Sequence, residues 1–409
     1  MKYKLFLPLL ISGIIIFSCN DAKKTSDLSQ SEEHTLLQTI DKNFIDADSQ
    51  YHVMMKLLPD GKFPKTYYPT TDKFEGSNSG WWCSGFYPGT LLKIYEQTKD
   101  TALLTEARRM LGLLEKEKLN THTHDLGFMM YCSFGTANIV DPSPAYKDIL
   151  ISSAQSLSSR FNPTVGTIKS WDGKPNEYLV IIDNMMNLEL LFWATKLTGD
   201  SSFYKIAVTH ANTTMKNHFR PDYSSYHVVN YNEKTGEVMQ RKTAQGFADE
   251  SAWARGQTWG LYGYTVMYRE TKDKKYLDQA NHIADFILTN PNLPADKIPY
   301  WDFNAPDIPN ALRDASAGAI MASALLELSK YVDTAHADKY FKTAEKLLET
   351  LSTDHYKATP GSNGGFILKH SVGHKPQNTE VDVPLTYADY YFVEAMERYK
   401  NYDKADAFY

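Results

Sequence analysis

The sequence predicts an all-α protein built as an (α/α)6 barrel, in which six helical hairpins form a double-layered ring. Two observations predict this fold class. A helical-hairpin pattern recurs along the chain, and the first helix of each copy is apolar nearly all round whereas the second is amphipathic. An apolar helix is buried on every side and an amphipathic one lies at the surface, so repeated pairs build an inner and an outer layer. An open helical solenoid would satisfy the same local pattern.

Residues 1–18 are predicted to be a signal peptide. Two lysines precede an apolar run, Leu5–Phe17, that is too short to cross a membrane as a mature helix. The run ends in Ile16-Phe17-Ser18-Cys19, which resembles a bacterial lipobox, so Cys19 is expected to carry a lipid anchor. Residues 19–34 are expected to form a polar tether. We therefore expect an exported, periplasmic or outer-membrane bacterial lipoprotein that meets the membrane only through this anchor; cleavage nearby without a lipid is the alternative.

Residues 35–409 are predicted to form one barrel domain, because the hairpin pattern spans them. In each copy a short turn ends in Asp, and the next helix carries an aromatic residue or Leu and then an Ala four positions later. The Asp can cap that helix by accepting a backbone N–H, and the spacing of four places the other two residues on one face. There is room for about six hairpins. The copies are Asp100, Leu103 and Ala107; Asp200, Phe203 and Ala207; Asp273, Tyr276 and Ala280; and Asp333, Tyr340 and Ala344.

The helix before each turn is expected to be a buried inner helix. Strand-like sequence is confined to short stretches that suit hairpin loops on the ring. The inner helices are predicted within Val180–Leu197, Trp259–Tyr268 and Ile320–Leu328, and the strand-like stretches are Tyr226–Tyr231 and Gly365–Leu368.

The composition describes an ordinary globular protein. The chain has 409 residues, 42% of them hydrophobic, and a net charge of −6. No run of Lys or Arg could neutralise a row of phosphates, so extended nucleic-acid binding is excluded. Aromatic residues make up 13% of the chain, and sugar faces stack well on such rings. Cys83 and Cys132 are the other two cysteines. Two thiols do not make a disulfide framework, and the sequence does not show whether they pair.

Asp183 is a polar exception within an apolar run. A carboxyl in a predicted buried helix is partly desolvated, which raises its pKa and keeps a proton available near neutral pH. This favours a catalytic acid. An Asp in the first turn of a helix can also merely cap it, and the residues alone leave both interpretations open.

Asp125 lies in the loop Thr121–Phe128, which turns at Gly127. His122 and His124 beside it suggest a metal, but no further His or Cys cluster has ligand-like spacing. A carboxylate that contacts a sugar fits better, and the sequence predicts no metal and no organic cofactor.

A third cluster lies in Gln245–Trp259. On a helix that begins near Ser251, Arg255 and Trp259 are four apart and place a guanidinium beside an indole, which suits a carboxylate on a sugar ring. The alternative is a structural arginine that pairs with Asp249 or Glu250. Two alternatives also exist for the aromatic residues of Trp81–Pro88 and Tyr300–Phe303. They fill the core, or they are partly exposed rings on loops, which the neighbouring Gly and Pro residues favour.

Taken together, these segments resemble family 88 of the glycoside hydrolases, the unsaturated glucuronyl hydrolases, and the likeness runs from about Trp81 to Tyr391. The matching pieces occur in the family's order. They are Trp82-Cys-Ser-Gly-Phe86, His124-Asp-Leu-Gly-Phe128, Ile182-Asp-Asn-Met-Met-Asn187, His227, Gln245-Gly246, Ser251-Ala-Trp-Ala-Arg-Gly-Gln-Thr-Trp-Gly260 and Glu380-Val-Asp-Val-Pro384.

The resemblance implies an (α/α)6 barrel that removes a 4,5-unsaturated glucuronic acid from the non-reducing end of oligosaccharides made by polysaccharide lyases. Such enzymes hydrate the vinyl ether double bond, and the resulting hemiketal opens and releases the sugar. The resemblance implies that Asp183 is the acid and base and that Asp125 holds ring hydroxyls. The resemblance also implies which residues bind the uronate, and these are His227, Gln245, Arg255 and Trp259. It implies that Trp82 is the platform on which a sugar stacks.

The sequence departs from some relatives at the loop Lys369–Pro376. Relatives that prefer sulfated substrates carry a loop with Ser and Lys there, and Ser371 and Lys375 are present without the same spacing. Heparin-, chondroitin- and hyaluronan-derived substrates all remain open on this basis.

Two other functions compete. One is an unsaturated galacturonyl (rhamnogalacturonyl) hydrolase, which Asp125 and Arg255 disfavour because they match the glucuronyl type. The other is a non-catalytic, lipid-anchored oligosaccharide-binding protein, which has no evident use for a buried acid at Asp183.

Overall fold

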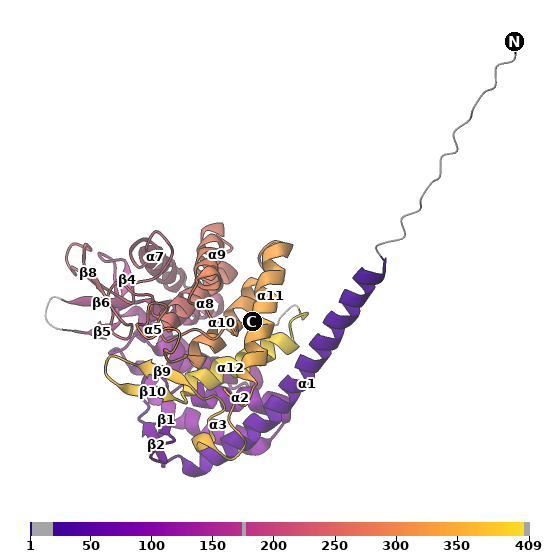
Figure 1. The fold of residues 1–409 in the computed structure, drawn as a ribbon. Coiled ribbons are helices and arrows are strands. Elements are labelled where there is room, and N and C mark those ends of the chain that lie inside the picture. The colour runs from indigo at the N-terminus through magenta and orange to yellow at the C-terminus, as the bar shows by residue number, and fades with distance from the viewer. Residues whose placement is uncertain (2–18, 174–176, 405–409) are drawn as a thin grey trace.

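The computed structural model describes residue 1, residues 19–173 and residues 177–404, with only the backbone described for residues 19–34. Two concentric layers of helices make up the barrel (Figure 1). The inner layer consists of α2 (Phe86–Thr98), the π-helix η2 (Gly127–Gly135) with α4 (Thr136–Val140), α6 (Leu188–Thr198), α8 (Ala254–Thr271), α10 (Ala315–Leu328) and α12 (Thr386–Lys400). The outer layer consists of α3 (Thr101–Leu114), α5 (Pro144–Ser158), α7 (Ser201–Asn217), α9 (Lys274–Thr289), α11 (Thr334–Leu351) and α1 (Cys19–Leu57).

The inner helices form a closed ring. Helix α12 packs against α10 on one side and against α2 on the other, so the last hairpin meets the first. Every residue of α10 is buried, as an inner helix requires. This closure confirms the predicted (α/α)6 barrel and excludes the open solenoid.

The predicted turns also form. The carboxylates of Asp100, Asp200, Asp273 and Asp333 each accept a backbone N–H two residues on, at the start of α3, α7, α9 and α11. The aromatic or Leu residue and the Ala that follow are buried in all four helices. The outer layer is therefore set by a local signal that the sequence shows directly.

Strands are more numerous than predicted within the described residues. Most of them form antiparallel hairpins at the barrel end where the inner helices begin. They are β1 (Phe63–Tyr68) with β2 (Lys73–Ser77), β3 (Phe161–Asn162) with β4 (Thr167–Ile168), a sheet of β5 (Trp171–Asp172), β6 (Tyr178–Ile181), β7 (Val228–Tyr231) and β8 (Val238–Lys242), and β9 (Ser371–His374) with β10 (Thr379–Val383).

Two predicted elements were wrong. Residues 180–187 of Val180–Leu197 are not α-helical, because Val180 pairs with Val229 between β6 and β7 and a 3-10 turn, η3 (Ile182–Asn187), precedes α6. Gly365–Leu368 forms no strand, because the N–H groups of Ile367 and Leu368 donate to the Asp389 carboxylate rather than to a ladder. Its first residue, Gly365, is the last residue of a short 3-10 turn, η4 (Asn363–Gly365).

Tyr300, Trp301 and Phe303 are also buried, so these rings are plugs rather than exposed loop residues. Trp81, by contrast, is 37% exposed, as the neighbouring glycine favoured.

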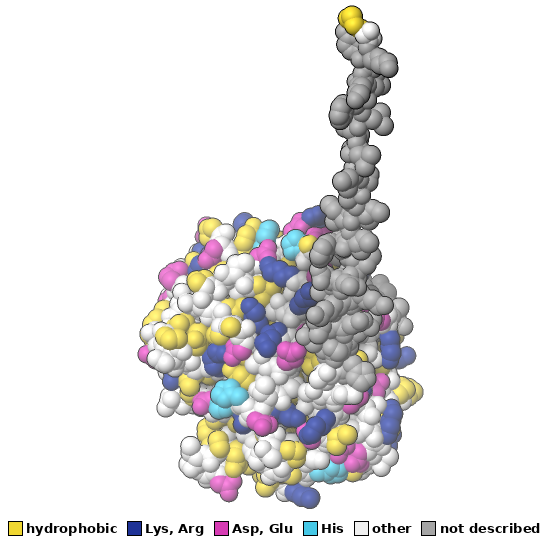
Figure 2. Space-filling model, turned by 45° about the vertical axis from the view of Figure 1, so that its right-hand side comes forward, with side chains coloured by type: hydrophobic (Ala, Val, Ile, Leu, Met, Phe, Trp, Pro, Cys, Tyr) yellow, Lys and Arg dark blue, Asp and Glu magenta, His cyan; other side chains and the backbone are white. Residues whose placement is uncertain are grey.

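Helix α1 projects from the barrel at its amino-terminal end (Figure 1). It begins at Cys19, so the segment predicted to be a tether is helical in its backbone. The predicted signal peptide lies almost wholly outside the described residues. No helix of the described chain has both the length and the apolar character needed to cross a bilayer. On the face in Figure 2, Lys and Arg side chains are interspersed with Asp and Glu.

Candidate active site

The predicted site residues gather at one end of the barrel, where the inner helices begin. Asp183 lies on η3 just before α6, Arg255 lies in the first turn of α8, and Asp314 caps α10. Unpaired backbone N–H groups give each helix N-terminus a partial positive charge. A mouth ringed by helix N-termini therefore favours an anionic ligand.

Asp183 is held between β6 and α6, where the chain turns from the four-stranded sheet into the inner ring. The residue is 7% exposed, and burial raises the pKa of its carboxyl to about 7, with the guanidinium of Arg255 opposing this rise and the Asp125 carboxylate adding to it. Its Oδ2 atom is buried without a hydrogen-bond partner. The carboxyl thus holds a proton near neutral pH, and its free oxygen does not have the role of a helix cap.

His227 faces Asp183 from the position just before β7, with Nε2 3.6 Å from Oδ2. The backbone N–H groups of Ala244 and Gln245 donate to His227 Nδ1 at 3.1 and 3.2 Å, so the ring proton of the neutral imidazole is on Nε2. Burial lowers the pKa of His227 well below its usual range, and Arg255 lowers it further. The neutral imidazole therefore directs its Nε2–H toward Asp183, and this donor has no hydrogen-bond partner.

Asp125 is fixed by its own loop. Thr123 Oγ1 donates to its carboxylate at 2.6 Å, and His124 Nε2 lies 3.3 Å from the other oxygen. His122 is directed away and lies 3.6 Å from the Asp172 carboxylate, so the His-His-Asp grouping weighed as a metal site does not assemble.

Arg255 is 1% exposed and has structural partners. Its guanidinium donates to the carbonyls of Val372 at 2.5 Å and Gly373 at 2.8 Å, and to the Asp314 carboxylate at 3.2 Å. The structural alternative expected this arginine to pair with Asp249 or Glu250. The structure pairs it with Asp314 instead. Arg255 Nε remains buried and without a partner. The residue thus supplies positive charge and a free Nε donor beside Asp183.

Gln245 bonds to the same strand as Arg255, because its Nε2 donates to the Gly373 carbonyl at 2.9 Å. Two predicted site residues therefore hold β9 in place at the mouth. Within that strand Ser371 is fully buried and its hydroxyl has no partner, whereas Lys375 follows at the edge, half-buried.

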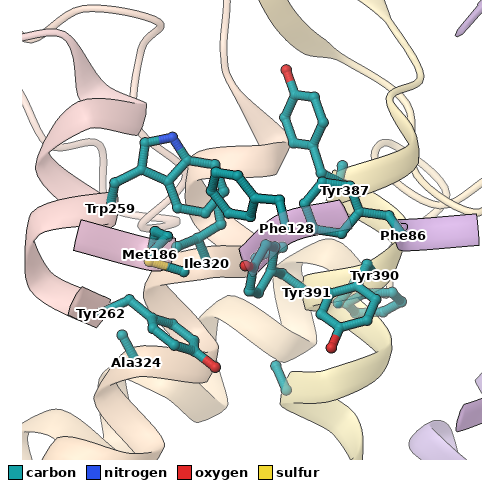
Figure 3. Close-up of a cluster of buried hydrophobic side chains, with 14 of the residues drawn as sticks. Phe86, Phe128, Met186, Trp259, Tyr262, Ile320, Ala324, Tyr387, Tyr390 and Tyr391 are labelled. Carbon is teal, nitrogen blue, oxygen red and sulfur yellow. The ribbon is translucent and has the colours of Figure 1, made fainter. Parts of the chain in front are cut away.

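Trp82 and Trp259 both pack against Phe128, and Figure 3 shows Phe128 and Trp259 within a cluster of buried aromatic side chains. The Phe128 ring lies between them, with centroids 5.4 Å from Trp82 and 5.1 Å from Trp259. Trp82 is half-buried and also contacts Tyr387 at 4.9 Å, so one part of its ring is available for stacking. Trp259 is fully buried, and its Nε1 atom lies close enough to lower the pKa of Asp183 yet has no hydrogen-bond partner.

Four buried polar atoms without partners thus lie around one space: Asp183 Oδ2, His227 Nε2, Trp259 Nε1 and Arg255 Nε. Buried polar groups in proteins are usually paired, so the gathering of four unpaired atoms around Asp183 indicates where a ligand binds. A protonated carboxyl, neutral donors and nearby positive charge suit protonation of a neutral carbon centre beside an anionic group.

Sequence reasoning missed Trp253, Asp314 and Trp171. Trp253 lies between two site residues, with its ring 4.4 Å from the His227 ring and 4.4 Å from the Arg255 guanidinium. Asp314 caps α10 by accepting the backbone N–H of Ser316, as the other Asp caps do, but it precedes an inner helix, and the hairpin pattern marks caps only before outer helices. Trp171 is half-buried on β5 with its ring 6.4 Å from His227, and no local pattern marks it.

Cys83 and Cys132 are both free thiols, which answers the question of their pairing.

Comparisons with known proteins agree with this geometry. The Glycosyl Hydrolase Family 88 model matches residues 53–408. The chain is 43% identical to the unsaturated glucuronyl hydrolase of Formosa agariphila over 97% of this chain and 98% of that protein. It is 32% identical to the unsaturated chondroitin disaccharide hydrolase of Streptococcus pneumoniae over 81% and 83%. A crystal structure of an unsaturated glucuronyl hydrolase specific for heparin superposes with a TM-score of 0.87 and 48% identity, covering 90% of this chain and 99% of that one. The chain is therefore a glycoside hydrolase that belongs to family 88.

Proposed function

We propose that this protein removes a 4,5-unsaturated glucuronic acid from the non-reducing end of glycosaminoglycan oligosaccharides made by lyases. The observation that carries the proposal is Asp183, a buried carboxyl with a pKa of about 7 whose Oδ2 atom has no hydrogen-bond partner. Relatives with the same fold carry the name of this activity.

The reaction is hydration of the vinyl ether double bond. Asp183 gives its proton to carbon 4, water adds its oxygen to carbon 5, and the second proton of that water returns to the Asp183 carboxylate. The hemiketal formed at carbon 5 opens, and the sugar linked at carbon 1 is released. The acid is regenerated at the end of the hydration step, because both proton transfers of that step use the Asp183 carboxyl.

The remaining residues orient the substrate. The uronate carboxylate lies toward Arg255 Nε and the helix N-termini, where positive potential is concentrated. His227 donates from Nε2 beside the reacting carbon, Asp125 accepts from ring hydroxyls, and Trp82 stacks on a sugar face.

Replacing Asp183 by Asn tests the proposal. Purified protein lacking residues 1–19 is mixed with an unsaturated disaccharide, and loss of the near-ultraviolet absorbance of its conjugated double bond is followed. We expect wild-type protein to consume the substrate and Asp183→Asn to be slower by a factor of about 10² to 10⁴.

Asp389 provides a matched control, because burial raises its pKa to about 7 as well. Both of its oxygens accept backbone N–H groups, from Ile367 and Leu368 at 2.9 Å, so it has a structural role. Asp389→Asn is expected to lower the unfolding temperature and to keep turnover in the folded fraction. Equal loss of turnover in both variants would remove the special role of Asp183.

We further propose that the preferred substrate comes from heparin or heparan sulfate. The support is 48% identity over 90% of this chain to a hydrolase described as specific for heparin. The kcat/KM for an unsaturated heparin disaccharide should exceed those for chondroitin and pectin disaccharides. A higher value on chondroitin disaccharide would reverse the preference, a higher value on galacturonyl-rhamnose would favour the galacturonyl alternative, and tight binding without consumption of any of them would favour the binding protein.

We propose, finally, that the protein is an exported lipoprotein anchored through Cys19. The support is the position of Cys19 at the end of the apolar run Leu5–Phe17. In a bacterium that expresses the full chain, Cys19→Ala should move the protein from the membrane fraction to the soluble fraction. An unchanged distribution would exclude the anchor.

A further inference from the structure

The indole of Trp253 contacts two of the residues that surround Asp183. Its ring centroid lies 4.4 Å from that of His227, with the two planes tilted by 36°, and the Arg255 guanidinium lies over the indole at 4.4 Å. Trp253 itself is 3% exposed. One buried ring therefore lies against both the Nε2–H donor and the cation of the site.

The position of Trp253 is fixed by its own backbone. It is the last residue before α8 and forms an antiparallel bridge with Asp302. The N–H of the next residue donates to the Trp301 carbonyl at 3.2 Å, and the carbonyl of the preceding residue accepts the Phe303 N–H at 2.9 Å. These bonds hold Trp253 independently of the two site residues that it contacts, so the indole can support both.

Two glycines leave room for the indole. A Cβ atom added at Gly256 would lie 2.8 Å from Trp253 Cε3, and one added at Gly246 would lie 3.1 Å from Trp253 Cβ. A side chain at Gly256 would therefore displace the ring, because close-packed interiors leave no space for such a contact. The first turn of α8 and the loop that carries Gln245 both pack closely around this one side chain.

His227 depends on the indole for its orientation. The two backbone N–H groups that donate to its Nδ1 atom fix the tautomer, but a ring held at one atom can still tilt. The Trp253 ring and the nearly perpendicular Trp171 ring, 6.4 Å away, limit this tilt. Because Nε2 is directed toward Asp183, a tilt would move the donor away from the reacting carbon.

Arg255 depends on the indole for the stability of its charge. Its guanidinium is buried, and an aromatic face stabilises a cation that is removed from water. The Trp253 and Tyr387 rings supply such faces at 4.4 and 5.2 Å, while carbonyl groups and the Asp314 carboxylate take the Nη1 and Nη2 donors. The Nε donor stays free for an anion.

We propose that Trp253 is a positioning residue for the hydration reaction, which holds the His227 donor and the Arg255 cation at one fixed separation beside Asp183. The proposal rests on the proposed function of these residues. Trp253 acts through both of them and does not need to touch the substrate. Removing the indole should therefore change two steps at once: binding of the uronate, through Arg255, and reaction at the double bond, through His227.

Three variants of the purified protein measure this role. Trp253→Leu removes the ring, and kcat/KM for an unsaturated heparin disaccharide should fall by a factor of about 10², with a lower kcat and a higher KM. Trp253→Phe keeps an aromatic face and should restore kcat/KM to within about tenfold of wild type. Trp193→Leu is the matched control, because it removes a partly buried indole of α6 that packs against the same core, and it should change neither constant in the folded protein.

Nitrogen-15 NMR of the histidine rings gives a readout that needs no turnover. In wild-type protein the His227 ring should show one tautomer with its proton on Nε2, and loss of that signal in His227→Gln assigns it. The signal should shift or broaden in Trp253→Leu and stay near its wild-type position in Trp253→Phe and Trp193→Leu. Gly256→Ala, which displaces the indole without removing it, should change both readouts in the same direction, and it replaces Trp253→Leu if that variant does not fold.

Unchanged kcat and KM in Trp253→Leu, together with an unchanged His227 signal, would overturn the proposal. Equal losses in Trp253→Leu and Trp253→Phe, or in Trp253→Leu and Trp193→Leu, would also overturn it, because these patterns indicate general packing. If wild-type protein consumes no unsaturated disaccharide, the proposed catalytic function fails, and the NMR comparison still decides whether Trp253 positions His227.

Discussion

The two ends of the barrel use buried polar residues in opposite ways. At the catalytic mouth, Asp183, His227 and Trp259 each leave a buried polar atom without a partner. At the far end, Arg269 and Arg398 are surrounded by carboxylates and hydrogen bonds. Unpaired groups reduce stability and are retained where they meet a substrate, whereas paired groups fix the ring of helices. The difference predicts that mutations at one end change turnover and mutations at the other change folding.

The largest expected effect on stability is at the far end. Arg269→Met leaves Glu189 and Glu327 without their shared cation, and this should lower the free energy of unfolding by about 3–5 kcal/mol. Urea unfolding measures it. Arg108→Met is the control, since Arg108 pairs with Asp141 at an exposed position and should change stability little. Unchanged stability in Arg269→Met would show that the ion network does not hold the barrel.

The next effect concerns pH at the catalytic mouth. Because the pKa of Asp183 is about 7, kcat should fall about tenfold for each pH unit well above that value as the acid loses its proton. A rate profile from about pH 5 to about pH 9 measures this. A rate that stays constant throughout that range would contradict the assigned acid.

The same titration affects folding. The folded pKa of Asp183 lies above its unfolded value of 3.8, so its contribution to stability is present below about pH 4 and is lost as the pH rises through about 7. Asp183→Asn removes this loss and should raise the free energy of unfolding at pH 8 by up to about 4 kcal/mol. Urea unfolding of both proteins at pH 5 and pH 8 gives the comparison, and an equal difference at the two pH values would refute the coupling.

A smaller effect is expected at Trp82. Trp82→Ala removes a stacking surface and should raise KM about fivefold with little change in kcat, since stacking contributes about 1 kcal/mol. Trp82→Phe keeps an aromatic face and should restore most of the affinity. Initial rates over a range of substrate concentrations separate the two constants, and a KM unchanged in Trp82→Ala would place the substrate elsewhere.

The smallest effect is expected from reducing agents. Cys83 and Cys132 are free, and burial raises the pKa of both thiols. Dithiothreitol should therefore change neither the unfolding temperature nor turnover. In protein lacking residues 1–19, two thiols should react with a thiol reagent after unfolding and more slowly before it.

The outer layer could be predicted because its signals are local. Asp200 caps α7 through an N–H two residues away, and Phe203 and Ala207 share a face by spacing alone. The strand β6 was missed for a physical reason, since Val180–Ile182 is an apolar run that suits a buried strand as well as a buried helix. Its pairing with β7 is decided by residues almost fifty positions away.

The candidate site was predicted as a set of residues but not as a network. The resemblance placed Asp183, His227 and Arg255 together, and the structure gathers them. The partners of Arg255 lie 59, 117 and 118 positions along the chain, at Asp314, Val372 and Gly373, and no local spacing indicates such contacts. The fixed Nε2–H of His227 likewise depends on two backbone donors from another loop.

The cluster of buried aromatic side chains in Figure 3 also determines how a polymer is degraded. Phe128, Trp259 and Tyr391 are buried and pack ring against ring across the inside of the barrel, so a sugar chain does not thread between them. The catalytic pocket is blind: only the last residue of a chain reaches the acid, and both products leave by the way the substrate entered. Each visit therefore removes one terminal sugar, which makes the enzyme exo-acting whatever the length of the chain.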